Sequence, residues 1–367
     1  MFEDELREAL RAGRPEPPES YRTRLDIEIA RLRLQEGITM KRSTRALITA
    51  AVFLALTMAA AAAAGIITWR RGLDDKLKLN EETLDIFKDT DLIDLPGLSQ
   101  THNGVTVTLE ECVVQPDTAY IAFRVSGYRP ELRDEGPYSH EEPQFRETLV
   151  TVDGVETVDY LEPRFFNGLD GWGILADGSS YQEGSNFQYL NENGEMVYII
   201  TLYNYHGNAS FVGRQAHVTL KDLGVDSTRY TGTEVHAEGT WDFAWTLKGS
   251  GRGVELKDLD LVIGTTGAKL KELTLRPVSA RMTVTVPPEA PEGRDEFGNT
   301  PVFRGVRLKD GTVYGGLAGR GFIGLDDEDT CGQMWTLLRI IDPEQVESLL
   351  FTRSMESEEV IQVRITP

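Results

Sequence analysis

The chain has few of the residues that build metal and redox sites. Its 367 residues include two cysteines, Cys112 and Cys331, and five histidines. Two cysteines so far apart do not make a disulfide scaffold. We expect them in different domains, although a single bridge in an oxidising compartment is the alternative. The histidines lack the HxH and HExxH spacings of metal ligands and read as surface or strand residues: His102, His140, His206, His217 and His236. We therefore predict no metal site and no cofactor.

Sequence motifs of catalysis are also missing. GxSxG does not occur, and neither cysteine lies near a histidine in a nucleophile pattern. Gly319, Gly321 and Gly324 match GxGxxG, but the acidic run 326–329 that follows would repel a pyrophosphate, so we expect a β-turn loop there. The same run has oxygen ligands that suit Ca²⁺, but we interpret it as a solvated loop. The sequence predicts that the protein is not an enzyme.

Basic charge is scarce beyond the N-terminal segment. The formal net charge is −21, whereas residues 1–45 hold ten basic and nine acidic side chains, so the excess of acid lies after residue 68. Because phosphate binding needs clustered Lys and Arg, this composition argues against direct nucleic-acid binding. An acidic surface suits solubility outside a cell, or the binding of cations and basic partners.

One long stretch has no charge and no proline. It runs from Ala46 to Thr68 and reads ALITAAVFLALTMAAAAAAGIIT. A helix of this length reaches about 34 Å, enough to cross a hydrocarbon core of about 30 Å. Trp69 follows at the place of an interfacial aromatic, with Arg70 and Arg71 behind it. We predict a transmembrane helix with Ala46 and Thr68 as its ends; a buried core helix would normally show a polar stripe.

A signal peptide is the main alternative to an uncleaved anchor. From Met40 the chain has a basic start, an apolar run and small residues fit for cleavage, but a charged segment precedes Met40. The fifteen residues before Ala46 hold five basic side chains and the fifteen after Thr68 hold four. This small excess predicts a single-pass protein of the cell membrane, with its N-terminus in the cytoplasm and its C-terminal domains outside.

Residues 1–45 form the predicted cytosolic tail, with two short amphipathic helices separated by GRPEPP. Each helix has an apolar stripe that the other is too short to cover well. The sharper interpretation is a partner-docking surface, because exposed apolar stripes usually find a groove; a loose juxtamembrane segment is the alternative. The candidate partner-binding residues are Phe2, Leu6, Leu10, Tyr21, Leu25 and Ile29.

The segment after the anchor reads as β structure. Residues 69–97 form a spacer with a possible short helix over 80–88, and from Gly104 apolar residues alternate with polar ones, the pattern of strands with one buried face. Alternation returns at Trp241, Phe243 and Trp245, and Asp310-Gly311 is a hairpin signal. We also expect a turn at Gln115–Asp117 and strands that include Met196–Leu202, Val302–Leu308 and Trp335–Ile341. We predict a mainly β protein with two exterior β-sandwich domains of immunoglobulin-like type, at 98–228 and 229–367.

This layout resembles a family of Gram-positive bacterial membrane proteins that carry the domain of unknown function 4179. The resemblance covers most of the chain. It rests on FEDELREAL and PPESYRTRLDIEIARL in the tail, on LDDKLKLN and HNGVTVTLEECVVQPDTAYIAFRVSG after the anchor, and on WDFAWTL, LTLRPVSARMTV, VRLKDGTVY and IIDPEQVESLLF in the second block. None of these is a strict motif.

Such proteins are considered similar to anti-sigma factors. The resemblance therefore implies that the inner tail holds an extracytoplasmic-function sigma factor while the outer domains sense an envelope signal or ligand. Many anti-sigma factors have a zinc motif of one His and two Cys in the inner tail, and residues 1–45 contain neither residue, so that version is excluded. The alternative function is an anchored extracellular binding or structural module with an inert tail.

Overall fold

The computed structural model describes the chain from Leu73 onwards, with gaps. Described are Leu73, Leu77 and residues 92–131, 141–156, 160–166, 169–170, 174–175, 189–205, 210–227, 230–285, 300–325, 330–353, 357 and 359–365. The chain divides into two units, 1–67 and 68–367, and the described residues all belong to the second. The predicted tail, the stretch Ala46–Thr68 and the spacer helix over 80–88 lie outside the described residues. Within the described ranges, no helix has the length and apolar character needed to cross a bilayer.

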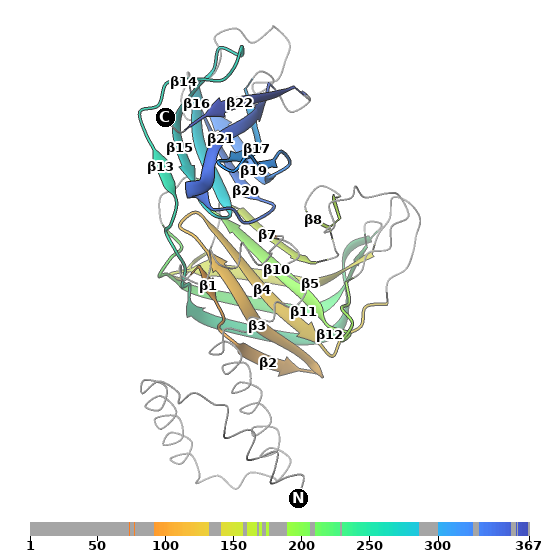
Figure 1. Cartoon of the computed structure of the whole chain (residues 1–367). Helices are drawn as coiled ribbons and strands as arrows, with labels where there is room; N and C mark the ends of the chain where they lie inside the picture. Colours follow the sequence, from red (N-terminus) through yellow and green to blue (C-terminus); the bar gives the residue numbers. More distant parts are fainter. Residues whose placement is uncertain are drawn as a thin grey trace, which may run out of the picture. The chain divides into compact units, whose positions relative to one another are not determined.

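The first half of the described chain folds into two antiparallel sheets that pack face to face (Figure 1). The first sheet has the order β1-β3-β4-β10-β7, with β2 also paired to β3. Its strands are β1 (Ile93–Asp94), β2 (Leu98–His102), β3 (Val105–Val114), β4 (Thr118–Ser126), β7 (Tyr160–Phe165) and β10 (Met196–Tyr203). The second sheet has the order β12-β11-β5-β6, from β5 (Glu141–Val152), β6 (Val155–Glu156), β11 (Gln215–Ser227) and β12 (Tyr230–Thr246). We call this pair the first sandwich.

The second half repeats the arrangement. The third sheet has the order β13-β15-β16-β20-β19, with β14 also paired to β15, and the fourth has the order β18-β17-β21-β22. The strands of the third sheet are β13 (Val254–Leu256), β14 (Leu261–Val262), β15 (Lys269–Leu275), β16 (Ser279–Thr285), β19 (Ala318–Leu325) and β20 (Thr330–Leu337). Those of the fourth are β17 (Val302–Leu308), β18 (Val313–Tyr314), β21 (Val346–Thr352) and β22 (Val360–Arg364), with the 3₁₀ turn η1 (Pro343–Gln345) before β21. We call this pair the second sandwich.

The two sandwiches are a structural duplication. When the strands are matched in chain order, the two sandwiches have the same strand order in both of their sheets. Strands β1–β7 of the first correspond to β13–β19 of the second, and β10–β12 correspond to β20–β22. The first sandwich differs by the small extra sheet of β8 (Leu169–Asp170) and β9 (Ile174–Leu175). Even an irregularity is shared. The ladder between β3 and β4 slips between Leu109 and Glu111, and that between β15 and β16 slips between Leu270 and Glu272.

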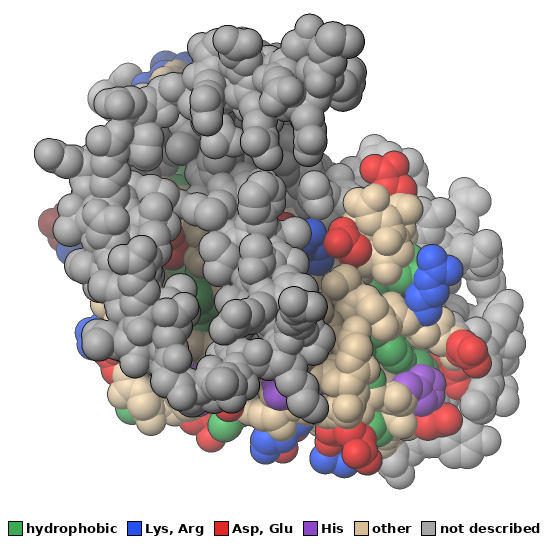
Figure 2. Space-filling model, turned by 90° about the horizontal axis from the view of Figure 1, so that it is seen from below, with side chains coloured by type: hydrophobic (Ala, Val, Ile, Leu, Met, Phe, Trp, Pro, Cys, Tyr) green, Lys and Arg blue, Asp and Glu red, His purple; other side chains and the backbone are tan. Residues whose placement is uncertain are grey.

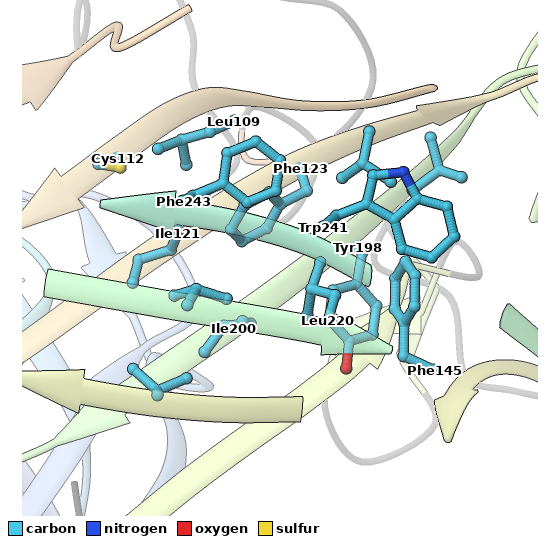
Figure 3. Close-up of a cluster of buried hydrophobic side chains, with 14 of the residues drawn as sticks. Leu109, Cys112, Ile121, Phe123, Phe145, Tyr198, Ile200, Leu220, Trp241 and Phe243 are labelled. Atoms are coloured by element: carbon cyan, nitrogen blue, oxygen red, sulfur yellow. The ribbon is translucent and has the colours of Figure 1, made fainter. Parts of the chain in front are cut away.

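The mainly β character predicted from period-two patterning is confirmed, but the expected division at residue 228 is corrected. Strand β12 pairs with β11, so the alternating Trp241, Phe243 and Trp245 belong to the core of the first sandwich. In Figure 3, Trp241 and Phe243 lie among Phe123, Phe145 and Tyr198. The sheets divide between Thr246 and Val254 instead. Alternation tells which face of a strand is buried, but not which sheet the strand joins.

The two cysteines lie in different cores. Cys112 belongs to the core of the first sandwich and Cys331 to that of the second, and both are buried thiols. Burial raises the pKa of the Cys112 thiol well above its ordinary value, with nearby Asp94 adding to the effect. This thiol therefore stays protonated and acts as a small apolar side chain.

The GxGxxG stretch is a strand, and the expected β-turn loop is wrong. Gly319, Gly321 and Gly324 lie in β19, which pairs with β20 at the edge of the third sheet. Glycine-rich composition fits an edge strand, which has a partner on one side only, as well as it fits a turn. Because the three glycines lie within a paired strand, they do not form the strand-to-helix turn that cradles a dinucleotide phosphate.

Candidate functional site

The outer face of the first sheet is apolar although it points away from the core of the first sandwich. Along β4, alternate residues such as Ile121 and Phe123 enter that core, whereas Tyr120 and Ala122 enter a second cluster on the opposite face. We call this second group the junction cluster. Its buried members are Leu73, Leu77, Leu92, Val113, Tyr120, Ala122, Phe166, Ile199, Val278 and Ile340. It therefore combines residues of both sandwiches with residues that precede them in the chain.

Leu73 and Leu77 bring the segment that follows the predicted anchor into this cluster. Both are helical, and their exposed fractions are 1% and 0%. Both side chains lie in the junction cluster. The carbonyl of Leu77 accepts a hydrogen bond from the backbone N–H of Ile340 at 3.1 Å. The side chains of Leu73 and Leu77 thus share one cluster with residues of both sandwiches, and the Leu77 backbone also bonds to the second sandwich.

Two tight turns meet beside the junction cluster. In each turn, the backbone N–H of the first residue donates a hydrogen bond to the carbonyl of the fourth. Gln115 donates to Thr118 at 2.8 Å, and Arg276 donates to Ser279 at 2.9 Å. The first turn joins β3 to β4, and the second joins β15 to β16, so they are equivalent in the duplication. Proline stands second in both, where its fixed φ favours a turn.

The contacts between these turns are charged and buried. Arg276 donates from Nη1 to Oδ2 of Asp117 at 2.8 Å, and from Nη2 to Oε1 of Glu255 at 3.2 Å. The hydroxyl of Ser279 donates to Oδ1 of Asp117 at 2.9 Å. Asp117 is 4% exposed and Arg276 is 9% exposed. A pair as buried as this is costly to break, because the remaining charge would stay in a poorly solvating environment.

The same turns contact each other reciprocally. The third residue of the first turn, Asp117, binds the first residue of the second turn, Arg276. In return, the first residue of the first turn, Gln115, accepts a hydrogen bond at Oε1 from the backbone N–H of Val278, the third residue of the second turn, at 3.2 Å. Farther along the equivalent strands, the Tyr120 hydroxyl bonds to Thr336, and Arg281 donates to the carbonyl of Asn204. A reciprocal pattern of this kind is what a two-fold interface between two copies produces.

The contact is not fully satisfied. Three buried side-chain atoms beside it have no hydrogen-bond partner among the described residues: Nε2 of Gln115, Oγ1 of Thr118 and Nε of Arg276. A buried donor or acceptor without a protein partner typically costs about 1–3 kcal/mol. The junction is therefore weaker than its ion pair alone suggests.

A second polar cluster lies at Tyr128. Its hydroxyl is 3.1 Å from Nδ1 of His236, and Nε2 of that ring is 3.5 Å from Oε1 of Glu234. Burial, together with Glu131 and Glu234, raises the pKa of Tyr128 to about 12. The phenol thus stays protonated near neutral pH, and the row of three groups lacks an activated nucleophile. No group of three or more metal-ligating side chains occurs in the part of the chain that the structure describes.

The remaining histidines in the described ranges are strand residues, as expected. His102 in β2 lies edge-on to Trp241, and His217 in β11 is 3.2 Å from Asp242. Figure 2 shows one face of the molecule, on which acidic and basic side chains of the described residues are interspersed.

The predicted site residues and the observed junction do not coincide. The candidate partner-binding residues Phe2, Leu6, Leu10, Tyr21, Leu25 and Ile29, and the anchor ends Ala46 and Thr68, lie outside the described residues. The sequence predicted a turn at Gln115–Asp117 but not its contact with Arg276. A signal was present in Tyr120–Phe123, an unbroken apolar run typical of a strand buried on both faces.

Comparisons with known proteins add little to this picture. No family model matches the chain, and no curated protein matches it. A solved structure, described as a conserved domain protein from Bacillus anthracis, is similar over 77% of this chain and 82% of its own, with 13% sequence identity and a TM-score of 0.41. A likeness this distant supports no inference about function.

Proposed function

We propose that the chain is a membrane-anchored regulator of the anti-sigma-factor type. In this proposal residues 1–45 are short cytosolic helices that dock an extracytoplasmic-function sigma factor, residues 46–68 span the membrane, and two immunoglobulin-like sandwiches outside sense an envelope signal. The support from the sequence is the uncharged run, the apolar stripes of the tail and the resemblance to proteins with the domain of unknown function 4179.

One structural observation favours a signalling role. Leu73 and Leu77, a few residues after the predicted anchor, are buried in the junction cluster together with residues of both sandwiches. A passive module needs only a flexible linker between anchor and domain. A linker that is packed into the domain ties the end of the anchor to the state of the domain, as a transmitter requires.

A pull-down of the full chain in detergent tests this function, with a sigma factor from the same genome as the probe. Burying one Leu or Ile in a partner groove is worth about 1.5–3 kcal/mol, so Leu25→Asp and Ile29→Asp should each weaken binding about tenfold or more. Arg31→Glu, on the polar face, is the matched control and should matter less because exposed ion pairs contribute little.

The alternative outcome is equally clear. If the wild-type chain retains no sigma factor, or if both aspartate variants retain it as well as the wild type does, the regulatory function fails. The anchored extracellular module with an inert tail then takes its place. Cysteine labelling of intact cells at Ser20→Cys and Ser250→Cys tests the topology: labelling at 250 alone supports the proposed orientation, and labelling at 20 alone reverses it.

A further inference from the structure

The site that holds Leu73 and Leu77 is composite. Their partners in the junction cluster include Val113, Tyr120, Ala122 and Ile199 from the first sandwich and Val278 and Ile340 from the second. Val278 is itself held in place, because its backbone N–H donates to Gln115 within the contact between the turns. Neither sandwich alone supplies the whole site, so Leu73 and Leu77 can dock fully only while the two sandwiches touch.

The duplication provides an internal control for this docking. The outer face of the third sheet has polar or small residues where the first sheet has apolar ones. The paired residues Val113 and Tyr120 of the first sheet correspond to the pair Thr274 and Arg281 of the third. The pair Ala122 and Ile199 corresponds in the same way to Thr283 and Gly332. Thr274, Arg281 and Thr283 are half-exposed. The apolar face is therefore specific to the sandwich that receives the helical segment, and is not a general property of the repeat.

We infer that Leu73 and Leu77 form a latch whose docking is thermodynamically coupled to the contact between the two sandwiches. When a site is built from two bodies, whatever opens their contact weakens docking, and whatever removes the docked segment weakens their contact. Among the described residues, Leu73 and Leu77 lie in the junction cluster, and the carbonyl of Leu77 accepts a hydrogen bond from Ile340.

This inference deepens the proposed function by naming the element that would carry a signal toward the anchor. Its test does not use a sigma factor, so the two can fail separately. The experiment measures maleimide labelling rates of the full chain in detergent. Leu73→Cys reports release of the latch, and Ser279→Cys reports opening of the junction. The native Cys112 and Cys331, buried in the first and second cores, together report global unfolding.

The coupling predicts an effect in each direction. Asp117→Asn, which removes the charge that Arg276 faces, should raise the labelling rate at Leu73→Cys about tenfold. Leu77→Ala should raise the rate at Ser279→Cys by a similar factor. Two controls remove comparable groups elsewhere: Asp260→Asn, an exposed carboxylate paired with Lys269 and Lys271, and Thr283→Ala on the outer face of the third sheet. Both should change the rates less than twofold.

Three results would overturn the inference. The first is an effect in one direction only, and the second is controls that act as strongly as the test substitutions. The third is labelling of Cys112 and Cys331 that rises in step with that of Leu73→Cys, since the opening would then be global. If Asp117→Asn yields no folded protein, Arg276→Lys keeps the charge but loses the two-pronged contact with Asp117 and Glu255, and the same criteria apply to it.

Discussion

The two sandwiches share one strand order but differ in what their outer faces do. In the first, Val113, Tyr120, Ala122 and Ile199 form a buried apolar surface that packs with Leu73 and Leu77. In the second, the equivalent positions hold Thr274, Arg281, Thr283 and Gly332. Because topology is the same, the difference must come from side chains on one face of one sheet. The core-facing residues preserve the fold, while the outward-facing ones decide which copy is joined to the segment that precedes it.

The largest expected difference between the two sandwiches is in their stability at alkaline pH, because the first sandwich contains several buried tyrosines. Burial raises the pKa of Tyr198 and Tyr203 above the ordinary value of 10.0, and that of Tyr128 to about 12. A folded pKa above the unfolded one means that the stabilisation is complete below pH 10 and is lost as the pH rises through the folded values.

Above pH 10 we therefore expect the free energy of unfolding to fall steeply. Tyrosinate absorbance and far-ultraviolet circular dichroism should change together as the first sandwich unfolds, while the circular dichroism of the second sandwich remains. Tyr198→Phe, which removes one titrating group and its 2.6 Å bond to Thr148, should make the fall shallower. Tyrosinate signals that titrate near pH 10, before any loss of circular dichroism, would show that these phenols are accessible in the folded protein.

The next largest effect concerns the ion pair between the copies. Asp117→Ala should lower the free energy of unfolding by about 3–5 kcal/mol, because it leaves the Arg276 guanidinium buried without its closest carboxylate. Urea denaturation of the full chain in detergent measures this. Replacing both partners, with Asp117→Ala and Arg276→Met, should cost less than Asp117→Ala alone. A double variant that is at least as unstable as the single one would contradict this explanation.

The smallest effect is expected when an apolar and a polar side chain are exchanged at one pair of equivalent positions in the two sandwiches. Val113→Thr should destabilise the protein by about 1–3 kcal/mol, because it buries a hydroxyl in the junction cluster without a partner. Thr274→Val, the reverse change on the half-exposed face of the third sheet, should stay within about 0.5 kcal/mol. The same denaturation assay compares them. Equal costs at the two positions would mean that the outer faces are not as different as the burial indicates.

Local turn and strand chemistry was readable in advance. Asp310-Gly311 was expected to turn a hairpin, and it lies between β17 and β18 with Gly311 at a φ of +92° and the Asp310 carboxylate bound to the N–H of Thr312. Strands expected at Met196–Leu202 and Val302–Leu308 are present as β10 and β17. The strand expected from Trp335 to Ile341 is β20, which begins earlier, at Thr330, and also ends earlier, at Leu337. Element type was thus more predictable than element limits.

The sequence by itself determined the mainly β character, the turns that separate many of the strands and the absence of recognisable catalytic motifs, because these depend on residues close together in the chain. Tertiary structure alone decided that β12 joins the first sandwich, that the two sandwiches repeat one topology, and that Leu73 and Leu77 pack in one cluster with Tyr120 and Ile340. These features depend on contacts between residues far apart in the chain. A period-two pattern specifies that a face is buried, whereas the partner that buries it is chosen by the free energy of the whole fold.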